Sequence, residues 1–397
     1  MKRERSMKLK LLIPTLSILA LCGGHPAWAT DKPATESIKL GQSCALSGPT
    51  KDLGVYMFKG AKAYFDHVNS KGGVNGKLIE HIVVNDGYEP NMTITNTENL
   101  IKEQKVFALF GEVGTPTSKV ALPIAEKNNT PFIMPLTGAR FLRDPINKLA
   151  VNFRAGYEEE IEALTQYVVG DKGVKKISIF YQDDDYGKAG LEATKAALQK
   201  RSLQLASTET YVRNFPDIPK EVFDRVKAVN PDAVIMVGAY LPCANFIKGA
   251  KNAGMKNTLF CNISFVGSES LVQELQGATE NVIISQVVPL PWDTSNPAVR
   301  EYQELFSKVY PGDKIGFVSL EGFLAAKLTV KGLEKAGQAV TRESFINALE
   351  SLDKNALTGL TISLGKEDHQ AMDSVYLTSY TQGAFREIKH VTVSKQE

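Results

Sequence analysis

Short β-branched apolar runs alternate with segments of helical periodicity from Ile38 onward. This alternation predicts a parallel, doubly wound α/β sheet, because each parallel strand needs a crossover helix before the next strand begins. The expected strands form two series, which are separated near residues 150–156. They are Ile38–Cys44, Ile79–Asn85, Val106–Phe110 and Thr130–Pro135, then Ile177–Gln182, Leu205–Tyr211, Ala233–Gly238 and Thr258–Cys261. The chain of 397 residues exceeds the size at which single cores stop growing, so we expect two similar lobes.

The C-terminal third has a different pattern. An extended run ending in prolines, Val282–Trp292, suits a passage between lobes. Helices are expected at Pro297–Val309, Ser319–Ala336 and Thr341–Leu349, and short strands at Leu360–Ser363, Ser374–Tyr380 and Phe385–Val393.

The turn after Val106–Phe110 has the features of an anion site. Thr115 suits a helix N-cap and Pro116 the first helical position, and the helix continues through Val120–Lys127. Its free N–H groups and positive dipole end would favour a small carboxylate. The alternative is an ordinary strand-to-helix turn.

The N-terminal segment, Met1–Ala29, has the pattern of an export signal. A basic start precedes the apolar run Leu11–Leu21, and Ala27 and Ala29 supply the small residues that precede a cleavage site. We expect cleavage after Ala29; Cys22 offers the alternative of a lipid anchor, although bulky Leu21 disfavours it. No later apolar run reaches the length of a membrane helix.

Charge and motif content exclude several classes of function. Lys and Arg number 46 against 44 Asp and Glu, and removal of the basic leader leaves the chain near neutrality, so no nucleic-acid partner is expected. The sequence has no Gly-x-Ser-x-Gly, P-loop or His-Glu-x-x-His motif, and its histidines are scattered. We therefore expect no catalytic activity, no cofactor and no metal site.

Three cysteines remain after the expected cleavage. Cys243 and Cys261 both fall near the carboxyl edge of the second series of strands and form the best candidate disulfide, with Cys44 left as a buried thiol. Three free thiols are the alternative.

Several short motifs occur together in a characteristic order: Leu46–Pro49, Lys71–Gly76, Gly114–Thr117, Asp185–Gly187, Gly238–Tyr240 and Ser319–Gly322. With them the chain resembles the periplasmic substrate-binding proteins of the branched-chain amino acid (Leu/Ile/Val-binding, type I) class that serve ABC importers. The resemblance implies a clamshell with three hinge crossings, near Arg154–Gly156, Ser285–Pro291 and Leu357–Ser363. Residues 30–155 and 289–357 would form lobe 1, and residues 156–288 and 358–397 lobe 2.

The resemblance also implies a ligand site between the lobes. Thr115 matches the position that holds the ligand carboxylate, while Leu136 and Gly138 match a neighbouring loop in which Thr137 would replace the hydroxyl that Gly138 lacks. Leu53 matches a contact with the apolar part of the ligand, and Tyr186 and Tyr240 match aromatic lids. Ser47, in the first loop, is a further candidate.

Ser264 is the main departure, because it stands where amino-acid binders carry an acid for the ligand's ammonium. An ammonium buried without a counter-charge is costly. Either Asp184, Asp185 or Glu321 provides that charge, or the ligand lacks an α-amino group, as a small organic acid, an amide or an aromatic carboxylate would; the sequence slightly favours the second reading.

The resemblance implies a monomeric, non-catalytic periplasmic receptor that delivers a small amino acid, carboxylate or amide to an inner-membrane ABC permease. The alternative role is a periplasmic sensor subunit that reports the solute to a signalling receptor.

Overall fold

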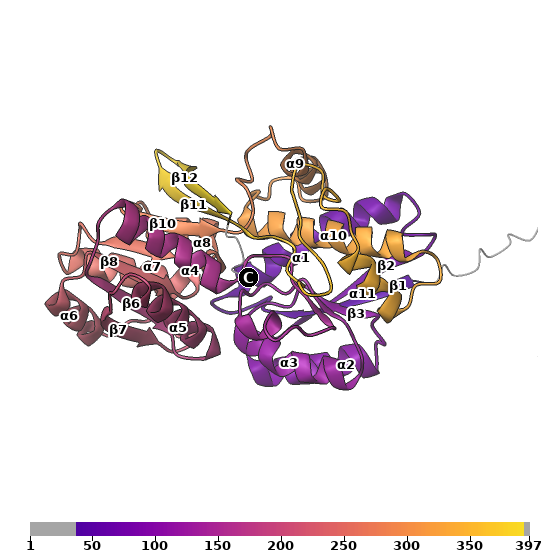
Figure 1. Ribbon diagram of the computed structural model, residues 1–397, viewed down its shortest axis with the longest axis horizontal. Helices are drawn as coiled ribbons and strands as arrows, with labels where there is room; N and C mark the ends of the chain where they lie inside the picture. Colours follow the sequence, from indigo (N-terminus) through magenta and orange to yellow (C-terminus); the bar gives the residue numbers. More distant parts are fainter. Residues whose placement is uncertain (1–36, 393–397) are drawn as a thin grey trace, which may run out of the picture. The chain divides into compact units, whose positions relative to one another are not determined.

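The computed structural model describes residues 37–392, so the predicted export signal lies outside the described part of the chain. Two sheets organise the described residues (Figure 1). The first is wholly parallel with the order β2-β1-β3-β4-β5: β1 (Ser37–Cys44), β2 (Leu78–Asn85), β3 (Ala108–Phe110), β4 (Phe132–Ile133) and β5 (Ala150–Val151). Its inner strands β3 and β4 are apolar and buried on both faces, as expected for a parallel sheet.

Helices cover both faces of the first sheet. Figure 1 shows α2 (Pro90–Lys102) and α3 (Thr115–Lys127) on one face, and α1 (Lys51–Ser70) with α10 (Phe317–Ala336) on the other. Beneath α2 and α3 lies a separate small core that includes Leu100, Leu109 and Phe132. The helices thereby leave the carboxyl ends of the strands free to carry the loops of a site.

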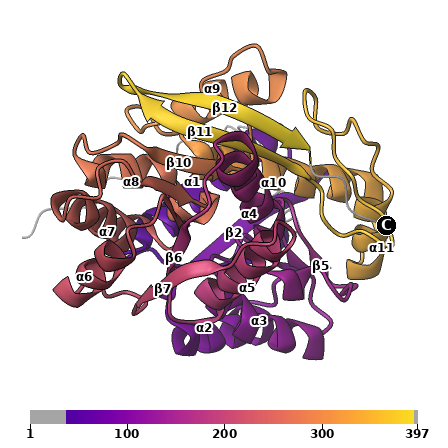
Figure 2. The ribbon, with the colours of Figure 1, turned by 60° about the vertical axis from the view of Figure 1, so that its left-hand side comes forward.

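The second sheet has the order β12-β11-β10-β9-β8-β6-β7. Its parallel strands are β6 (Ile177–Gln182), β7 (Leu205–Tyr211), β8 (Ala233–Val237), β9 (Leu259–Asn262) and β10 (Val282–Gln286). The antiparallel hairpin of β11 (Ser374–Thr381) and β12 (Ala384–Thr392) extends this sheet beyond β10 (Figure 2). The doubly wound α/β class predicted from the sequence is confirmed.

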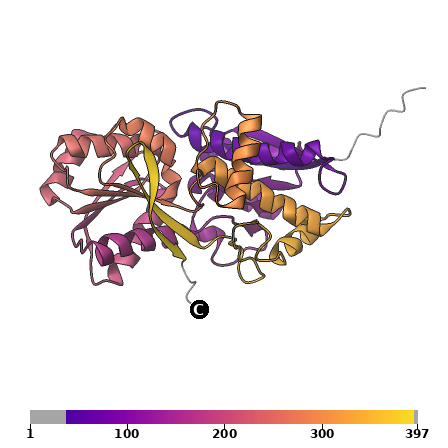
Figure 3. The same ribbon diagram turned by 90° about the horizontal axis from the view of Figure 1, so that it is seen from above.

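Five helices flank the second sheet. Figure 3 shows α4 (Tyr157–Thr165) and α5 (Asp185–Gln199) on one face and α6 (Lys220–Val229), α7 (Tyr240–Asn252) and α8 (Ser268–Leu275) on the other. A π-helical turn, Gln166–Asp171, continues α4. Asp184 caps α5, because its side chain accepts a hydrogen bond from the Tyr186 amide. This acid therefore stabilises the start of the helix.

The remaining helices, α9 (Pro297–Val309), α10 and α11 (Arg342–Glu350), pack with the first lobe. Helix α10 is apolar almost all round and is buried over most of its length, which explains its weak amphipathic pattern. None of the helices between residues 37 and 392 combines the length and apolar character needed to cross a membrane.

The third crossing between lobes lies later than the sequence indicated. Residues 363–372 remain with the first lobe, because the amides of Ala371 and Met372 donate to the carbonyls of Asn152 and Phe153. The chain enters the second sheet only at Ser374, the first residue of β11. The expected strand Leu360–Ser363 is absent, since this segment makes isolated bonds rather than a ladder.

Two further expectations need correction. Gly114, with φ of 108°, is the N-cap of α3, and Thr115 is its first helical residue, because the turn requires a left-handed backbone that Thr would adopt only with strain. The expected Cys243–Cys261 disulfide is not formed: Cys44, Cys243 and Cys261 are all free and buried.

Candidate functional site

The two lobes meet around a small cavity of about 10 Å³, which has room for about one water molecule. Both lobes and the crossing between them line it. The first lobe contributes Leu53, Leu136, Phe317, Val318 and Glu321, the second lobe contributes Ser264, Phe265 and Gln286, and the crossing contributes Val287 and Val288. Three of the residues predicted from the sequence, Leu53, Leu136 and Ser264, therefore converge here. They do so because the loops at the carboxyl ends of both sheets face this cavity.

Hydroxyl groups gather at the start of α3, next to Leu136. The Oγ1 atoms of Thr115 and Thr137 lie 2.7 Å apart, and the Tyr157 hydroxyl lies 3.5 Å from the first and 3.2 Å from the second. All three side chains are buried. This arrangement joins a helix N-terminus to several hydroxyls, a combination suited to an anionic group.

Gly138 packs directly against Tyr157. The Gly138 carbonyl accepts from the Tyr157 amide at 2.8 Å, and a Cβ at Gly138 would meet the Tyr157 ring at 2.5 Å. A side chain at position 138 is therefore excluded by the close approach of Tyr157. The buried hydroxyl of this loop belongs to the neighbouring Thr137.

The two predicted aromatic residues occupy different places. Tyr186 is fully buried, with its ring centroid 5.4 Å from that of Tyr157 and 4.7 Å from that of Phe265. Tyr240 lies across from α1, where its hydroxyl accepts a long hydrogen bond, 3.5 Å, from the Asp52 amide. Tyr186 thus packs within the aromatic wall behind the cavity, and Tyr240 bridges the lobes beside it.

Ser47 is not brought into this group. Its side chain is exposed, and its hydroxyl accepts a hydrogen bond from the amide of Asn85 at 2.8 Å. The structure gives Ser47 a role in shaping the loop after β1.

A buried charge cluster adjoins the cavity. The Arg154 guanidinium, 1% exposed, pairs with Glu160 at 3.1 Å and with Glu321 at 3.7 Å, and contacts the Ser264 hydroxyl. Glu160 accepts hydrogen bonds from the Ser264 amide at 2.7 Å and from the Ser285 hydroxyl at 2.6 Å. One guanidinium therefore faces two carboxylates where the lobes join.

Glu321 is the member of this cluster that lines the cavity. Burial raises the pKa of Glu321 to about 7, and neighbouring Glu160 adds to the rise while Arg154 and Arg143 oppose it. The carboxyl group therefore changes its charge near neutral pH.

The raised pKa of Glu321 predicts a pH-dependent stability. Because the folded protein holds this proton up to about pH 7, its contribution is fully present below the unfolded pKa of about 4.5 and is lost as pH rises through 7. Substitution by glutamine removes this titration, so the difference in unfolding free energy between wild type and E321Q should change by on the order of 3 kcal/mol between pH 4.5 and 8.5. Urea denaturation of both proteins across that range measures it; a constant difference would contradict the assignment. Burial also raises the pKa of Glu112 and Glu269, but both proteins share these groups.

Contacts between the lobes surround the cavity. Gln182 donates to the Tyr88 hydroxyl at 3.2 Å, Ser270 donates to Asp52 at 2.7 Å, and Lys119 pairs with Asp185 at 2.6 Å. Arg213 adds a pair with Glu89 at 3.1 Å. The lobes are closed on one another, so a ligand larger than a water molecule can enter only if they separate.

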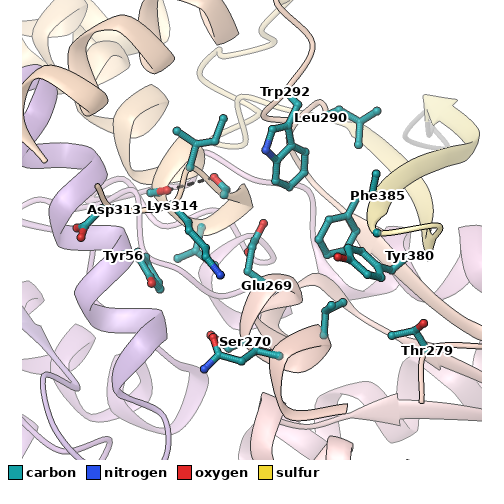
Figure 4. A pocket seen from close by; sticks show the side chains of 18 of the residues that line it. Tyr56, Glu269, Ser270, Thr279, Leu290, Trp292, Asp313, Lys314, Tyr380 and Phe385 are labelled. Carbon is teal, nitrogen blue, oxygen red and sulfur yellow. Dashed lines mark hydrogen bonds between the residues drawn. The ribbon is translucent and has the colours of Figure 1, made fainter. Parts of the chain in front are cut away.

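A much larger groove, of about 1150 Å³ (Figure 4), lies next to the small cavity, and Val318 lines both spaces. Trp292 and Phe385 stack on its wall with centroids 5.4 Å apart, beside Tyr380. Phe317 lines the small cavity and also packs against both of these rings. The groove is open, and the residues that line it do not include those predicted for the site.

The sequence does not indicate several residues that the structure brings to the junction, namely Tyr157, Glu160 and Phe265, and it indicates Arg154 only as part of a hinge crossing. A charged residue inside an otherwise apolar crossing was the available signal, because buried arginine requires a partner.

Within residues 37–392, no group of three or more His, Cys, Asp or Glu side chains is arranged to hold a metal ion.

Two doubly wound lobes that close around a lined cavity define a solute-binding protein of the type I class. The chain belongs to the periplasmic binding protein family, whose model matches residues 37–384. Leu/Ile/Val-binding protein homolog 7 of Brucella abortus is 24% identical over 365 residues, which cover 88% of this chain and 86% of that protein. The family resemblance found in the sequence is thereby confirmed.

Solved structures agree with this assignment. A possible leucine/isoleucine/valine-binding protein from Rhodopirellula baltica has a TM-score of 0.84 and 34% identity, and the match covers 89% of this chain and 97% of that one. A branched chain amino acid ABC transporter protein from Thermus thermophilus with bound valine has a TM-score of 0.82, with 91% and 97% covered; at 19% identity it shows the shared fold alone.

Proposed function

We propose that the protein is a non-catalytic periplasmic receptor that closes its lobes on a branched-chain amino acid or a close relative and delivers it to an ABC permease. The observation that carries the proposal is the cavity at the junction of the lobes, which has apolar walls and buried polar groups. A small solute with an apolar side chain and a charged end matches such a lining. The names of the relatives from Brucella abortus and Rhodopirellula baltica point to the same ligand class.

The cavity lining and the hydroxyl group beside it each have a counterpart in such a ligand. The hydroxyls of Thr115, Thr137 and Tyr157, at the N-terminus of α3, suit the carboxylate. The side chains of Leu53 and Leu136 suit a branched aliphatic group, because burying it gains about 0.8 kcal/mol per methylene. The ligand would take the space that opens when the lobes separate and would then hold them together.

Isothermal titration calorimetry of the exported chain with leucine, isoleucine and valine tests the proposal. We expect micromolar or tighter binding, since at the ceiling of about 1.5 kcal/mol per heavy atom a ligand of this size can reach that affinity. Glucose and glutamate serve as solutes of the wrong shape or charge. Failure of all three branched amino acids to bind would overturn the proposed ligand class.

Tyr240→Ala should release the ligand faster. Tyr240 joins the lobes through the Asp52 amide, so its removal weakens the closed form more than it disturbs either core. We expect the dissociation rate of leucine to rise roughly tenfold, which corresponds to ~1.4 kcal/mol. Stopped-flow fluorescence measures this rate.

Trp292→Ala is the matched control, because it removes an aromatic residue that lines the outer groove but not the small cavity. It should leave leucine affinity unchanged. A larger loss in this variant than in Tyr240→Ala would move the ligand site from the small cavity to the groove.

A further inference from the structure

We propose that Glu321 is the counter-charge for an ammonium group on the ligand, which makes the closed cleft selective for α-amino acids over their 2-oxo acid counterparts. This inference rests on the proposed function and adds to it the group that distinguishes the two ligand classes. It explains how a chain with Ser264 in place of an acid can still receive an ammonium.

Glu321 has unused capacity to accept hydrogen bonds. It lies in α10, is 4% exposed and lines the cavity beside Ser264. Its nearest charged partner is the Nε atom of Arg154, at 3.7 Å, which is too long for a hydrogen bond. Among residues 37–392 the structure shows no hydrogen bond to this carboxylate, and the Nε atom of Arg154 has none either. A buried carboxylate in this state favours a cationic donor in the cavity.

Glu160, Asp184 and Asp185 are already occupied by other partners. Both oxygens of Glu160 accept hydrogen bonds, from Arg154, Ser264 and Ser285. Asp184 accepts from the Tyr186 amide, from Gln182 and from Arg213. Asp185, 46% exposed, pairs with Lys119 at the surface. Of the acids that the sequence offered, only Glu321 faces the cavity.

Ser264 has a different task in this arrangement. Its hydroxyl donates to Glu160 at 3.0 Å and contacts the Arg154 guanidinium, so it joins the second lobe to the pair. An acid at position 264 would place a further negative charge directly against Glu160. The charge that recognises the ligand is therefore moved to α10 in the first lobe, on the other side of the cavity.

The arrangement links binding to protonation. Arg154 in the first crossing and Arg143 after β4 favour the ionised form of Glu321, Glu160 on α4 disfavours it, and burial holds its pKa at about 7. An ammonium at this carboxylate stabilises the ionised form, so below pH 7 binding must release a proton. A 2-oxo acid offers no positive charge and gains nothing from that ionisation.

Calorimetry of the wild-type protein with L-leucine and with 4-methyl-2-oxopentanoate, between pH 5.5 and 8.5, tests this linkage. Leucine should bind about tenfold more weakly for each pH unit below 7, and titrations in buffers of different ionisation enthalpy should show release of close to one proton at pH 6. The oxo acid should bind more weakly throughout and release no proton. Matching pH profiles for the two probes, or leucine binding without proton release at pH 6, would overturn the inference.

Glu321→Gln removes the charge and keeps the shape. At pH 8 we expect it to weaken leucine binding about 100-fold or more and to change oxo acid binding by less than about threefold. Glu334→Gln, in the same helix but paired with Lys331 at the surface, is the control and should leave both affinities unchanged. An equal loss for both probes would show that Glu321 acts through packing and would overturn the inference. Absence of binding by the wild type to either probe would instead overturn the proposed function, so the two failures are distinguishable.

Discussion

Replacing Arg154 with methionine should lower the free energy of unfolding by about 3–5 kcal/mol, because it leaves Glu160 and Glu321 buried without their shared cation. Removing one partner from a buried ion cluster costs much stability, because it leaves a buried charge uncompensated. Replacing all members of the cluster by apolar residues costs far less. Urea denaturation at pH 8 measures the loss. At pH 5 the deficit should shrink, since Glu321 then holds a proton and has no charge to compensate.

Arg140→Met is the matched control for this experiment. Arg140 also pairs with two acids, Asp144 and Glu158, but its side chain is 64% exposed. Surface pairs of this kind contribute little, so the control should change stability by no more than about 0.5 kcal/mol. If both variants lost the same small amount, the cluster around Arg154 would have no special role in joining the lobes.

Element boundaries are predicted correctly where the local signals in the sequence are strongest. Strands β6 and β7 and helix α9 begin and end where they were expected. Helix α9 carries its own start signal, because Asn296 caps it and Pro297 occupies its first position. Strand β5 was missed since two residues are too few to show a period, and Leu360–Ser363 was assigned as a strand because only the tertiary structure shows that its partners are irregular.

The candidate site was predictable where it depends on sheet topology. Leu53, Leu136 and Ser264 meet at one cavity because the loops at the carboxyl edges of two parallel sheets face each other. The charge cluster was not predictable in the same way. Arg154 and Glu160 are six residues apart, whereas neighbours on a helix surface are three or four residues apart. Glu321 joins them only because α10 packs with the first lobe. Pairing of isolated charges is a property of the packed lobes rather than of any local pattern.

Gly322→Ala should disrupt the packing of α10 on α1 and lower the free energy of unfolding by about 3 kcal/mol or more. A Cβ at position 322 would fall far inside contact distance of the Met57 carbonyl oxygen, and one at Gly60 would meet the Ser319 carbonyl in the same way. Both obstacles are backbone atoms, so the helices themselves must move apart. In an exposed helix the same substitution would instead stabilise the protein by about 1 kcal/mol. Here the close approach of the two helix backbones reverses the sign of the effect.

Gly332→Ala provides the comparison within the same helix. Its added Cβ would meet side-chain atoms of Leu349, at 2.6 Å, and of Phe345, at 2.9 Å, and side chains can shift where a backbone carbonyl cannot. Thermal unfolding should therefore show a large drop in Tm for Gly322→Ala and a much smaller change for Gly332→Ala. Because α10 also carries Glu321, displacement of the helix by Gly322→Ala should weaken leucine binding as well, whereas Gly332→Ala should preserve it. Equal effects of the two substitutions on stability would show that α1 and α10 are not held at backbone contact.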